Sequence, residues 1–152
     1  MNLTECYILA LKSISLLSVG KSDEAISCLD KLLEIKPDDT YALYKKGEVL
    51  AQLRKYREAT NTYQRLLNIN SRDVDVWVRK GKLHYDLGEY SECVYSEAVC
   101  CYDHVLNIDS NLSNVWYFKG QAHLRLDRSD AQYCFDKAKK LGFKINSLKK
   151  KN

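Results

Sequence analysis

Apolar residues recur along the chain in an order that predicts paired helices. An apolar residue, two variable residues, Lys and Gly follow one another three times, ending at Gly47, Gly81 and Gly120. The three glycines are 34 and 39 residues apart. After each block comes an Ala with an aromatic residue four positions on: Ala59 and Tyr63, Ala98 and Tyr102, Ala131 and Phe135. Self-similarity near 34 residues predicts stacked helix pairs, because one pair cannot bury its apolar face alone.

A fourth, degenerate copy precedes these three. Its second helix is marked by six residues that lie 34 positions before their equivalents in the next copy: Ala25, Leu29, Leu32, Leu33, Ile35 and Pro37. Its first helix is predicted over residues 3–19 and is closed by Gly20, with Ser13 where the other copies have Gly. We therefore expect four repeats.

Two local features fit this register. A mid-helix Gly costs about 1 kcal/mol relative to Ala, so we expect the two helices of a repeat to approach closely there. Ala59, Ala98 and Ala131 are expected to be the small residues opposite the glycines. Polar links at 37–39, 71–73 and 109–111 are predicted to supply side chains that cap the helices after them.

The pattern resembles the tetratricopeptide repeat, W-x2-L-G-x2-Y followed by A-x3-F and P, over about 140 of the 152 residues. The best copy runs from Val74 to Ser110. The resemblance implies an all-α fold, a right-handed superhelical α-solenoid of antiparallel helix pairs. One array is expected over residues 1–147, with a basic C-terminal tail at 148–152 and repeats at about 6–39, 40–73, 74–112 and 113–145.

One repeat is longer than its neighbours. Residues 90–94 (YSECV) are followed by the near copy YSEAV at 95–99, which adds five residues. We expect the second helix of this repeat to begin about one turn early. Tyr95 is predicted to pack near the core and Tyr90 to lie at the rim, so that deleting residues 90–94 leaves the fold intact. Drift at a helix end without function remains the alternative.

The composition and the N-terminal residues indicate a folded protein that does not span a membrane. The sequence is 45% hydrophobic and 29% charged, with a net charge of +4, which is too apolar for disorder. The apolar run at 6–19 lacks a basic leading region and a cleavage site, and it is shorter than the roughly 20 residues that span a bilayer. We expect a cytoplasmic protein without membrane contact. The short basic tail does not favour a nucleic-acid partner.

The six cysteines do not predict a disulfide framework. Cys28, Cys101 and Cys134 each precede a residue that packs the second helix of a repeat. Equivalent positions in successive repeats are on the order of 10 Å apart, beyond the roughly 7 Å limit between bridged Cα atoms. We interpret the cysteines as small buried thiols.

In the family that the chain resembles, the first helix of each repeat lines a concave face, the usual ligand surface. The residues between the packing positions of these helices mix aromatic and basic types, which anchor interfaces and meet carboxylates. They are Tyr44, Lys45, Glu48, Gln52, Val78, Arg79, Lys82, Tyr85, Asp86, Tyr117, Phe118, Gln121 and Arg125. We predict a protein or peptide ligand, and an acidic one fits. The alternative is a solvated surface with ion pairs such as Lys45 to Glu48 and Lys82 to Asp86.

The resemblance does not extend to the relatives that clamp a partner's terminal carboxylate with Lys and Asn. Tyr44 and Glu48 occupy those two positions if the second repeat leads, and Ala10 and Ile14 occupy them one repeat earlier. Binding of chaperone tails is therefore not predicted.

The first helix is apolar on nearly all sides, and no earlier repeat covers it. Leu9 and Leu16 are expected to pack inward, whereas Ala10, Leu11, Ile14 and Leu17 turn toward the groove. Exposed apolar surface at an array end implies a partner, a neighbouring domain or self-contact. Self-association through Leu11, Ile14 and Leu17 would make the chain a homo-oligomeric scaffold, which is the alternative function.

No catalytic or metal site is predicted. Cys93 and His104 on one helix would be roughly 16 Å apart, too far to share one ion with Cys100. His84 and His123 occupy the family's Tyr position, which favours a packing role. The sequence contains no glycine-rich phosphate loop or H-E-x-x-H. We therefore predict a non-enzymatic protein-interaction module without a cofactor.

Overall fold

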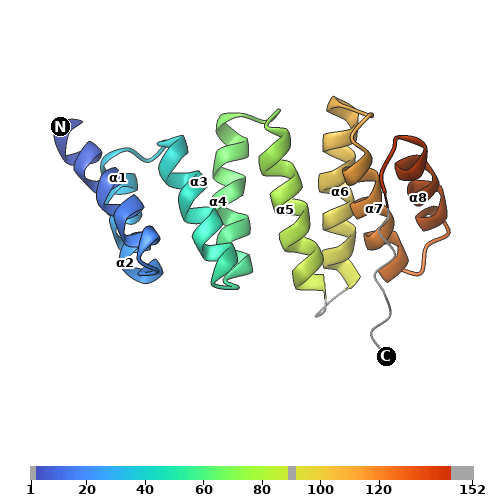
Figure 1. The fold of residues 1–152 in the computed structure, drawn as a ribbon, viewed down its shortest axis with the longest axis horizontal. Coiled ribbons are helices and arrows are strands. Elements are labelled where there is room, and N and C mark those ends of the chain that lie inside the picture. The colour runs from blue at the N-terminus through green and yellow to red at the C-terminus, as the bar shows by residue number, and fades with distance from the viewer. Residues whose placement is uncertain (1–2, 89–91, 145–152) are drawn as a thin grey trace. The chain divides into compact units, whose positions relative to one another are not determined.

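The computed structural model describes residues 3–88 and 92–144, and the regular structure in them is helical, as predicted (Figure 1). Contacts divide the chain into two compact units, Met1–Val76 and Trp77–Asn152. The helices are α1 Leu3–Ser18, α2 Ser22–Ile35, α3 Thr40–Gln52, α4 Tyr56–Ile69, α5 Val74–Leu87, α6 Glu92–Ile108, α7 Ser113–Arg125 and α8 Asp130–Lys140. Helix α5 begins in the first unit and continues in the second. Among the described residues, no helix is long and apolar enough to cross a membrane.

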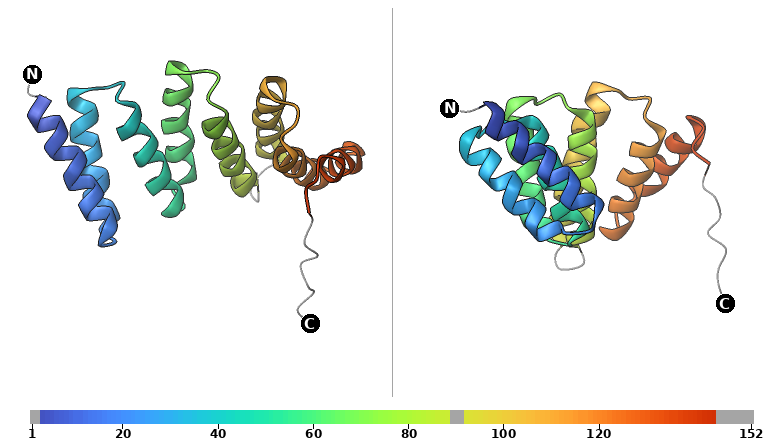
Figure 2. Two further views of the ribbon diagram at one scale, coloured as in Figure 1. Left: turned by 45° about the horizontal axis from the view of Figure 1, so that its top comes forward. Right: turned by 60° about the vertical axis from the view of Figure 1, so that its left-hand side comes forward.

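The first unit contains two antiparallel helix pairs, α1 with α2 and α3 with α4 (Figure 2). Helix α2 also packs on α3, which joins one pair to the next. The largest fully buried side chains of this unit come from both pairs: Leu29, Leu32, Leu43, Leu50 and Tyr63. The apolar positions that set the 34-residue spacing thus form its core.

The second unit repeats this arrangement. Helix α6 packs on α7, and α7 pairs with α8. Tyr102, Val105, Val115 and Cys134 are fully buried between these helices. The equivalent positions of successive repeats therefore perform the same packing role in both units.

Aromatic rings, rather than the expected alanines, are the nearest side chains to the repeated glycines. A β-carbon added at Gly47 would overlap the ring of Tyr63. One at Gly81 would lie 2.6 Å from Tyr102, and one at Gly120 would lie 2.7 Å from Phe135. The prediction of close helix approach is correct, but Ala59, Ala98 and Ala131 are not the residues that require it. The glycine makes room for a flat ring.

The polar links cap two of the three predicted helices. Asp39 accepts a hydrogen bond from the backbone of Ala42, and Asp73 accepts one from Val76. The third prediction is wrong, because Asp109 instead accepts from the backbone of Asn111. The N-cap position of α7 is occupied by Leu112, one residue beyond the polar link, and Leu112 has no capping side chain.

The lengthened repeat starts its second helix early, as predicted. Helix α4 begins at Tyr56, whereas α6 begins at Glu92, three residues before the equivalent Tyr95. Tyr95 is buried, and its ring lies against Gly88. Tyr90, predicted at the rim, lies outside the described residues.

All six cysteines are free thiols, but they are not all buried. Cys28, Cys101 and Cys134 are buried as predicted, and burial raises the pKa of Cys101 to about 11. Cys93 and Cys100 are exposed, contrary to the prediction. They are seven residues apart on α6, so they share a face of that helix, and this face points to solvent.

Candidate functional site

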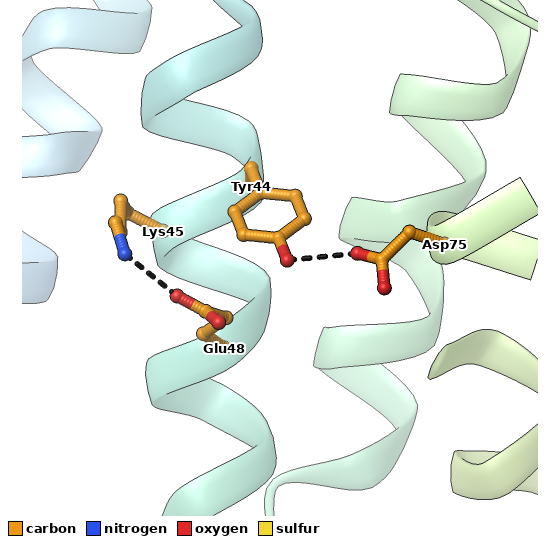
Figure 3. A network of polar contacts seen from close by, with 4 residues as sticks. All are labelled: Tyr44, Lys45, Glu48 and Asp75. Carbon is orange, nitrogen blue, oxygen red and sulfur yellow. Dashed lines mark hydrogen bonds and ion pairs between the residues drawn. The ribbon is translucent and has the colours of Figure 1, made fainter. Parts of the chain in front are cut away.

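In the first unit three predicted surface residues of α3 have polar partners within the chain. The Tyr44 hydroxyl donates to Asp75 Oδ2 at 2.8 Å, and Lys45 Nζ lies 2.9 Å from Glu48 Oε2 (Figure 3). The Lys45 to Glu48 ion pair is the alternative that the sequence allowed. Asp75 was not predicted as part of this surface, although its place in the first turn of α5 puts it within reach of the preceding first helix.

In the second unit two cations of the predicted set lie against aromatic rings of the same set. Lys82 Nζ on α5 is 4.3 Å from the ring centroid of Phe118 on α7. Arg125 Nε donates to the Tyr85 hydroxyl at 3.2 Å. Helices α5 and α7 thus bring together four residues that sequence reasoning selected only by their position in each repeat.

Tyr117 lies among the rings of Phe118, Phe135 and Phe143. Its hydroxyl accepts a hydrogen bond from Gln121 Nε2 at 3.2 Å. Its ring centroid lies 5.7 Å from that of Phe135 and 6.1 Å from that of Phe118. The ring of Phe143, which follows α8, stacks on Tyr117 at 4.6 Å and 23°. Phe143 was missed, although a Gly followed by an apolar residue at a helix end is the signal for such a contact.

The structure leaves the whole predicted set accessible. None of the thirteen residues is buried, and Gln52, Lys82, Asp86 and Arg125 are exposed. These residues are therefore accessible, and the clearest grouping of aromatic and basic side chains lies in the second unit.

The Lys of the repeated block has a packing role that the sequence analysis overlooked. Lys46 on α3 lies 2.6 Å from Asp30 on α2, and Lys119 on α7 lies 2.6 Å from Asp103 on α6. Each pair joins the first helix of a repeat to the second helix of the repeat before it. Lys119 also lies 5.4 Å from the ring centroid of Trp116, three residues earlier.

The two histidines at the family's Tyr position, His84 and His123, pack within the helix array. His123 is buried, and its Nδ1 atom has no hydrogen-bond partner among the described residues. His84 Nδ1 lies 2.9 Å from Glu97 Oε2, without a hydrogen bond between the two atoms. Burial lowers the pKa of His84 and of His123. At His84 the Glu97 carboxylate partly opposes this decrease in pKa and Lys80 adds to it, whereas at His123 Lys119 adds to it and Asp130 opposes it. The net effect on both residues favours the neutral imidazole.

Helix α1 presents an apolar surface to solvent. Leu11 and Ile14 are each 48% exposed, whereas Leu9, Ala10, Leu16 and Leu17 are half-buried. Further exposed apolar side chains lie on or just after the same helix: Leu3, Tyr7, Ile8 and Val19. Of the three residues proposed for self-association, Leu17 is thus the least accessible.

A pocket of about 310 Å³ opens beside this helix in the first unit. It is lined by Leu3, Cys6, Tyr7, Ala10, Leu32, Lys36, Asp39 and Tyr41. The Tyr41 hydroxyl is buried without a hydrogen-bond partner among the described residues. Across residues 3–88 and 92–144, no three His, Cys, Asp or Glu side chains come together as a metal site.

Comparison with known proteins agrees with this architecture. The family model for anaphase-promoting complex, cyclosome, subunit 3 matches residues 18–96. A MamA double mutant of strain RS-1 superimposes with a TM-score of 0.80 at 20% identity, covering 91% of this chain and 75% of that one. MamA from Desulfovibrio magneticus RS-1 gives 0.77 at 22% identity, covering 93% and 78%. No curated protein matches the sequence.

These likenesses identify the fold class as the all-α, tetratricopeptide-like α-solenoid of antiparallel helix pairs. The family match covers more than half of the chain and includes two of the three Lys-Gly blocks. The chain belongs to the tetratricopeptide-repeat family described as anaphase-promoting complex, cyclosome, subunit 3.

Proposed function

We propose that this chain is a non-enzymatic module that binds a peptide or protein segment across the first helices of its repeats. The family and the fold support an interaction or scaffold role. We take the array to be residues 1–147, in the four repeats delimited above, with 148–152 as a tail. The free thiols of the described residues favour a reducing, cytoplasmic setting.

The observation that carries this proposal is the grouping of cations and aromatic rings on α5 and α7. The Lys82 and Arg125 side chains are exposed, and each lies against a ring of the same surface. Lys and Arg side chains attract carboxylates, and a cation beside a ring places this attraction next to apolar area. The rings beneath supply apolar contact area. This combination fits a segment that carries acidic and apolar residues.

The binding mode follows from the placement of these groups. Tyr85, Tyr117 and Phe118 would contact apolar side chains of the ligand on the second unit, and Tyr44 is the corresponding aromatic anchor of the first unit. Arg79, Lys82 and Arg125 would fix the direction of the segment by pairing with its carboxylates. An extended or helical ligand could satisfy both requirements.

The test is a charge reversal on this surface. We expect Lys82→Glu/Arg125→Glu to lose the partners that the wild-type chain retains from a native lysate at matched salt. A matched control is Lys31→Glu/Lys139→Glu, which makes the same change of net charge at exposed positions on the second helices α2 and α8. Retention of the same partners by the Lys82/Arg125 variant would show that the binding surface lies elsewhere.

A second candidate function is self-assembly through α1, favoured by the six exposed apolar side chains of that region. We expect a concentration-dependent dimer in light scattering, lost on Leu11→Glu/Ile14→Glu. Leu124→Glu is the control, because Leu124 is an even more exposed apolar residue, on α7 in the other unit. A monomer at all concentrations would eliminate this candidate and leave the peptide-binding proposal untouched.

A further inference from the structure

One aromatic ring on the proposed binding surface comes from outside the first helices. Phe143 lies three residues after the end of α8 and stacks on Tyr117 with ring centroids 4.6 Å apart. Tyr117 is a member of the surface predicted to hold a ligand. The face of its ring that Phe143 covers is therefore already filled by the chain itself.

The backbone explains how Phe143 reaches this place. Gly142 has a φ of +89°, a conformation that residues with a β-carbon rarely adopt. Its N–H donates to Lys139 O, and the Phe143 N–H donates to Ala138 O. These two bonds form the Schellman turn that ends many helices, and such a turn directs the residue after the Gly back toward the fold. The last helix thus ends in a turn that places an aromatic side chain on the surface of α7.

The surroundings of this contact suit an aromatic side chain. Tyr117 is held by Gln121 at its hydroxyl and by the rings of Phe118 and Phe135. Lys82 lies over Phe118, so a cation borders the aromatic group. An aromatic ring of a ligand that enters here can stack on Tyr117. Acidic residues next to that ring in the ligand sequence can pair with the Lys82 cation.

We propose that the face of Tyr117 is a subsite for an aromatic side chain of the partner, and that Phe143 occupies this subsite in the free protein. This inference rests on the proposed function and names the chemistry of the ligand, an acidic segment that carries Phe, Tyr or Trp. Because one ring face cannot hold two rings, Phe143 leaves Tyr117 when the partner's ring binds.

The consequence is competition within the chain. The apparent affinity of a ligand equals its affinity for the open site multiplied by the fraction of molecules whose site is open. An aromatic pair contributes enough for removal of the internal ring to tighten ligand binding about two- to tenfold. The gain applies only to ligands that place a ring on Tyr117.

The experiment uses the full chain, the full chain with Phe143→Ala, and two short acidic peptides that differ only in a central Phe or Ala. Phe143→Ala keeps Gly142 and both backbone bonds of the turn. Tyr133→Ala removes an exposed aromatic ring of α8 instead and serves as the matched control. Binding is measured by fluorescence anisotropy of the labelled peptide. Ring–ring nuclear Overhauser effects (NOEs) between Phe143 and Tyr117 follow the internal contact.

We expect the Phe peptide to bind Phe143→Ala about two- to tenfold more tightly than it binds the wild-type or Tyr133→Ala chains. In the wild-type chain, saturation with the Phe peptide should abolish the Phe143–Tyr117 NOEs. The Ala peptide should bind all three chains equally. Equal or weaker binding of the Phe peptide to Phe143→Ala, or NOEs that persist at saturation, would overturn the subsite. If the Phe143 result fails while Lys82→Glu/Arg125→Glu still loses native partners, the proposed function stands and only the subsite is refuted.

Discussion

Residue size across each helix pair follows a simple complementarity. Three repeats place a Gly against a ring, as in Gly47 with Tyr63. The first repeat has Ser13 at the glycine position and Leu29 at the ring position, both fully buried. The Ser13 hydroxyl donates to the carbonyl of Ala10, which satisfies its polar group inside the helix pair. A larger residue on the first helix is thus matched by a smaller one on the second.

This complementarity predicts the result of exchanging one pair for another. Gly47→Ser should lower the free energy of unfolding by about 1–3 kcal/mol, because the added atoms meet the buried Tyr63 ring. Adding Tyr63→Leu, which copies the first repeat, should restore part of that loss, with a coupling of about 1 kcal/mol or more. Urea unfolding of both single variants and the double variant measures this coupling. Additive effects would show that the two residues do not compete for space.

The lowered pKa values of His84 and His123 predict a dependence of stability on pH. The unfolded chain binds protons on His84 and His123 near their ordinary pKa of 6.5, whereas the folded chain does so only at lower pH. Unfolding therefore takes up protons below about pH 6.5, and the free energy of unfolding falls as the pH decreases through this window. Chemical unfolding between about pH 7.5 and 5.5 checks this, with His84→Asn/His123→Asn as the comparison. The same decrease in both proteins would exclude the histidines as its cause.

At the scale of the helix, the turns that end the first helices of three repeats have the same backbone geometry, although different residues occupy the central position. Gly20, Arg54 and Asp127 all have positive φ after the first helix of a repeat. At each, the following N–H bonds a carbonyl five residues back, as Lys55 does to Leu50. Gly adopts this conformation without strain, whereas residues with a β-carbon do so at a cost of roughly 1–2 kcal/mol.

Arg54→Gly should therefore stabilise the first unit. The relief of strain exceeds the extra freedom that Gly gives the unfolded chain, so we expect a gain of about 0.5–1 kcal/mol in thermal or urea unfolding. Gly20→Ala is the converse control, because a β-carbon there meets nothing within 4 Å and only the backbone conformation is tested. A loss of stability on Arg54→Gly would indicate that the Arg54 side chain contributes more than its backbone strain costs.

Helix positions could be predicted from the sequence, but contacts between helices could not. The spacing of Ala25, Ala59 and Ala98 located the second helices because these small residues recur at buried positions. The ring opposite Gly47 was missed because spacing along one helix does not say which residue of the next helix it meets. The predicted cap of α7 was wrong because the helix begins one residue later than expected, so that Leu112 rather than a polar residue occupies the N-cap position.

The candidate surface shows the same division. Lys82 and Phe118 were both selected from the repeat register, but their 4.3 Å contact joins residues 36 positions apart and depends on how α5 and α7 stack. Phe143 was missed because it follows the last repeat and belongs to no periodic position. Its contact with Tyr117 is set by the turn at Gly142 rather than by the pattern.

At the scale of the whole molecule, the two candidate interaction surfaces belong to different units. The apolar residues of α1 lie in the first unit, and the aromatic and basic residues of α5 and α7 lie in the second. Their chemistries differ as well, since the α1 surface offers mainly aliphatic area and the other combines aromatic rings with Lys82 and Arg125. Substitutions that abolish binding at one surface should leave binding at the other unchanged.

The most direct measurement of the central claim is site-specific photo-crosslinking of the intact chain in a native lysate. A photoreactive amino acid is placed at Gln121 on the proposed surface, at Tyr133 on α8 or at Ile14 on α1. The account predicts a crosslinked partner from position 121 that is absent from position 133 and disappears when Lys82→Glu/Arg125→Glu is added. Crosslinks that form from position 14 or 133 but not from position 121 would contradict it.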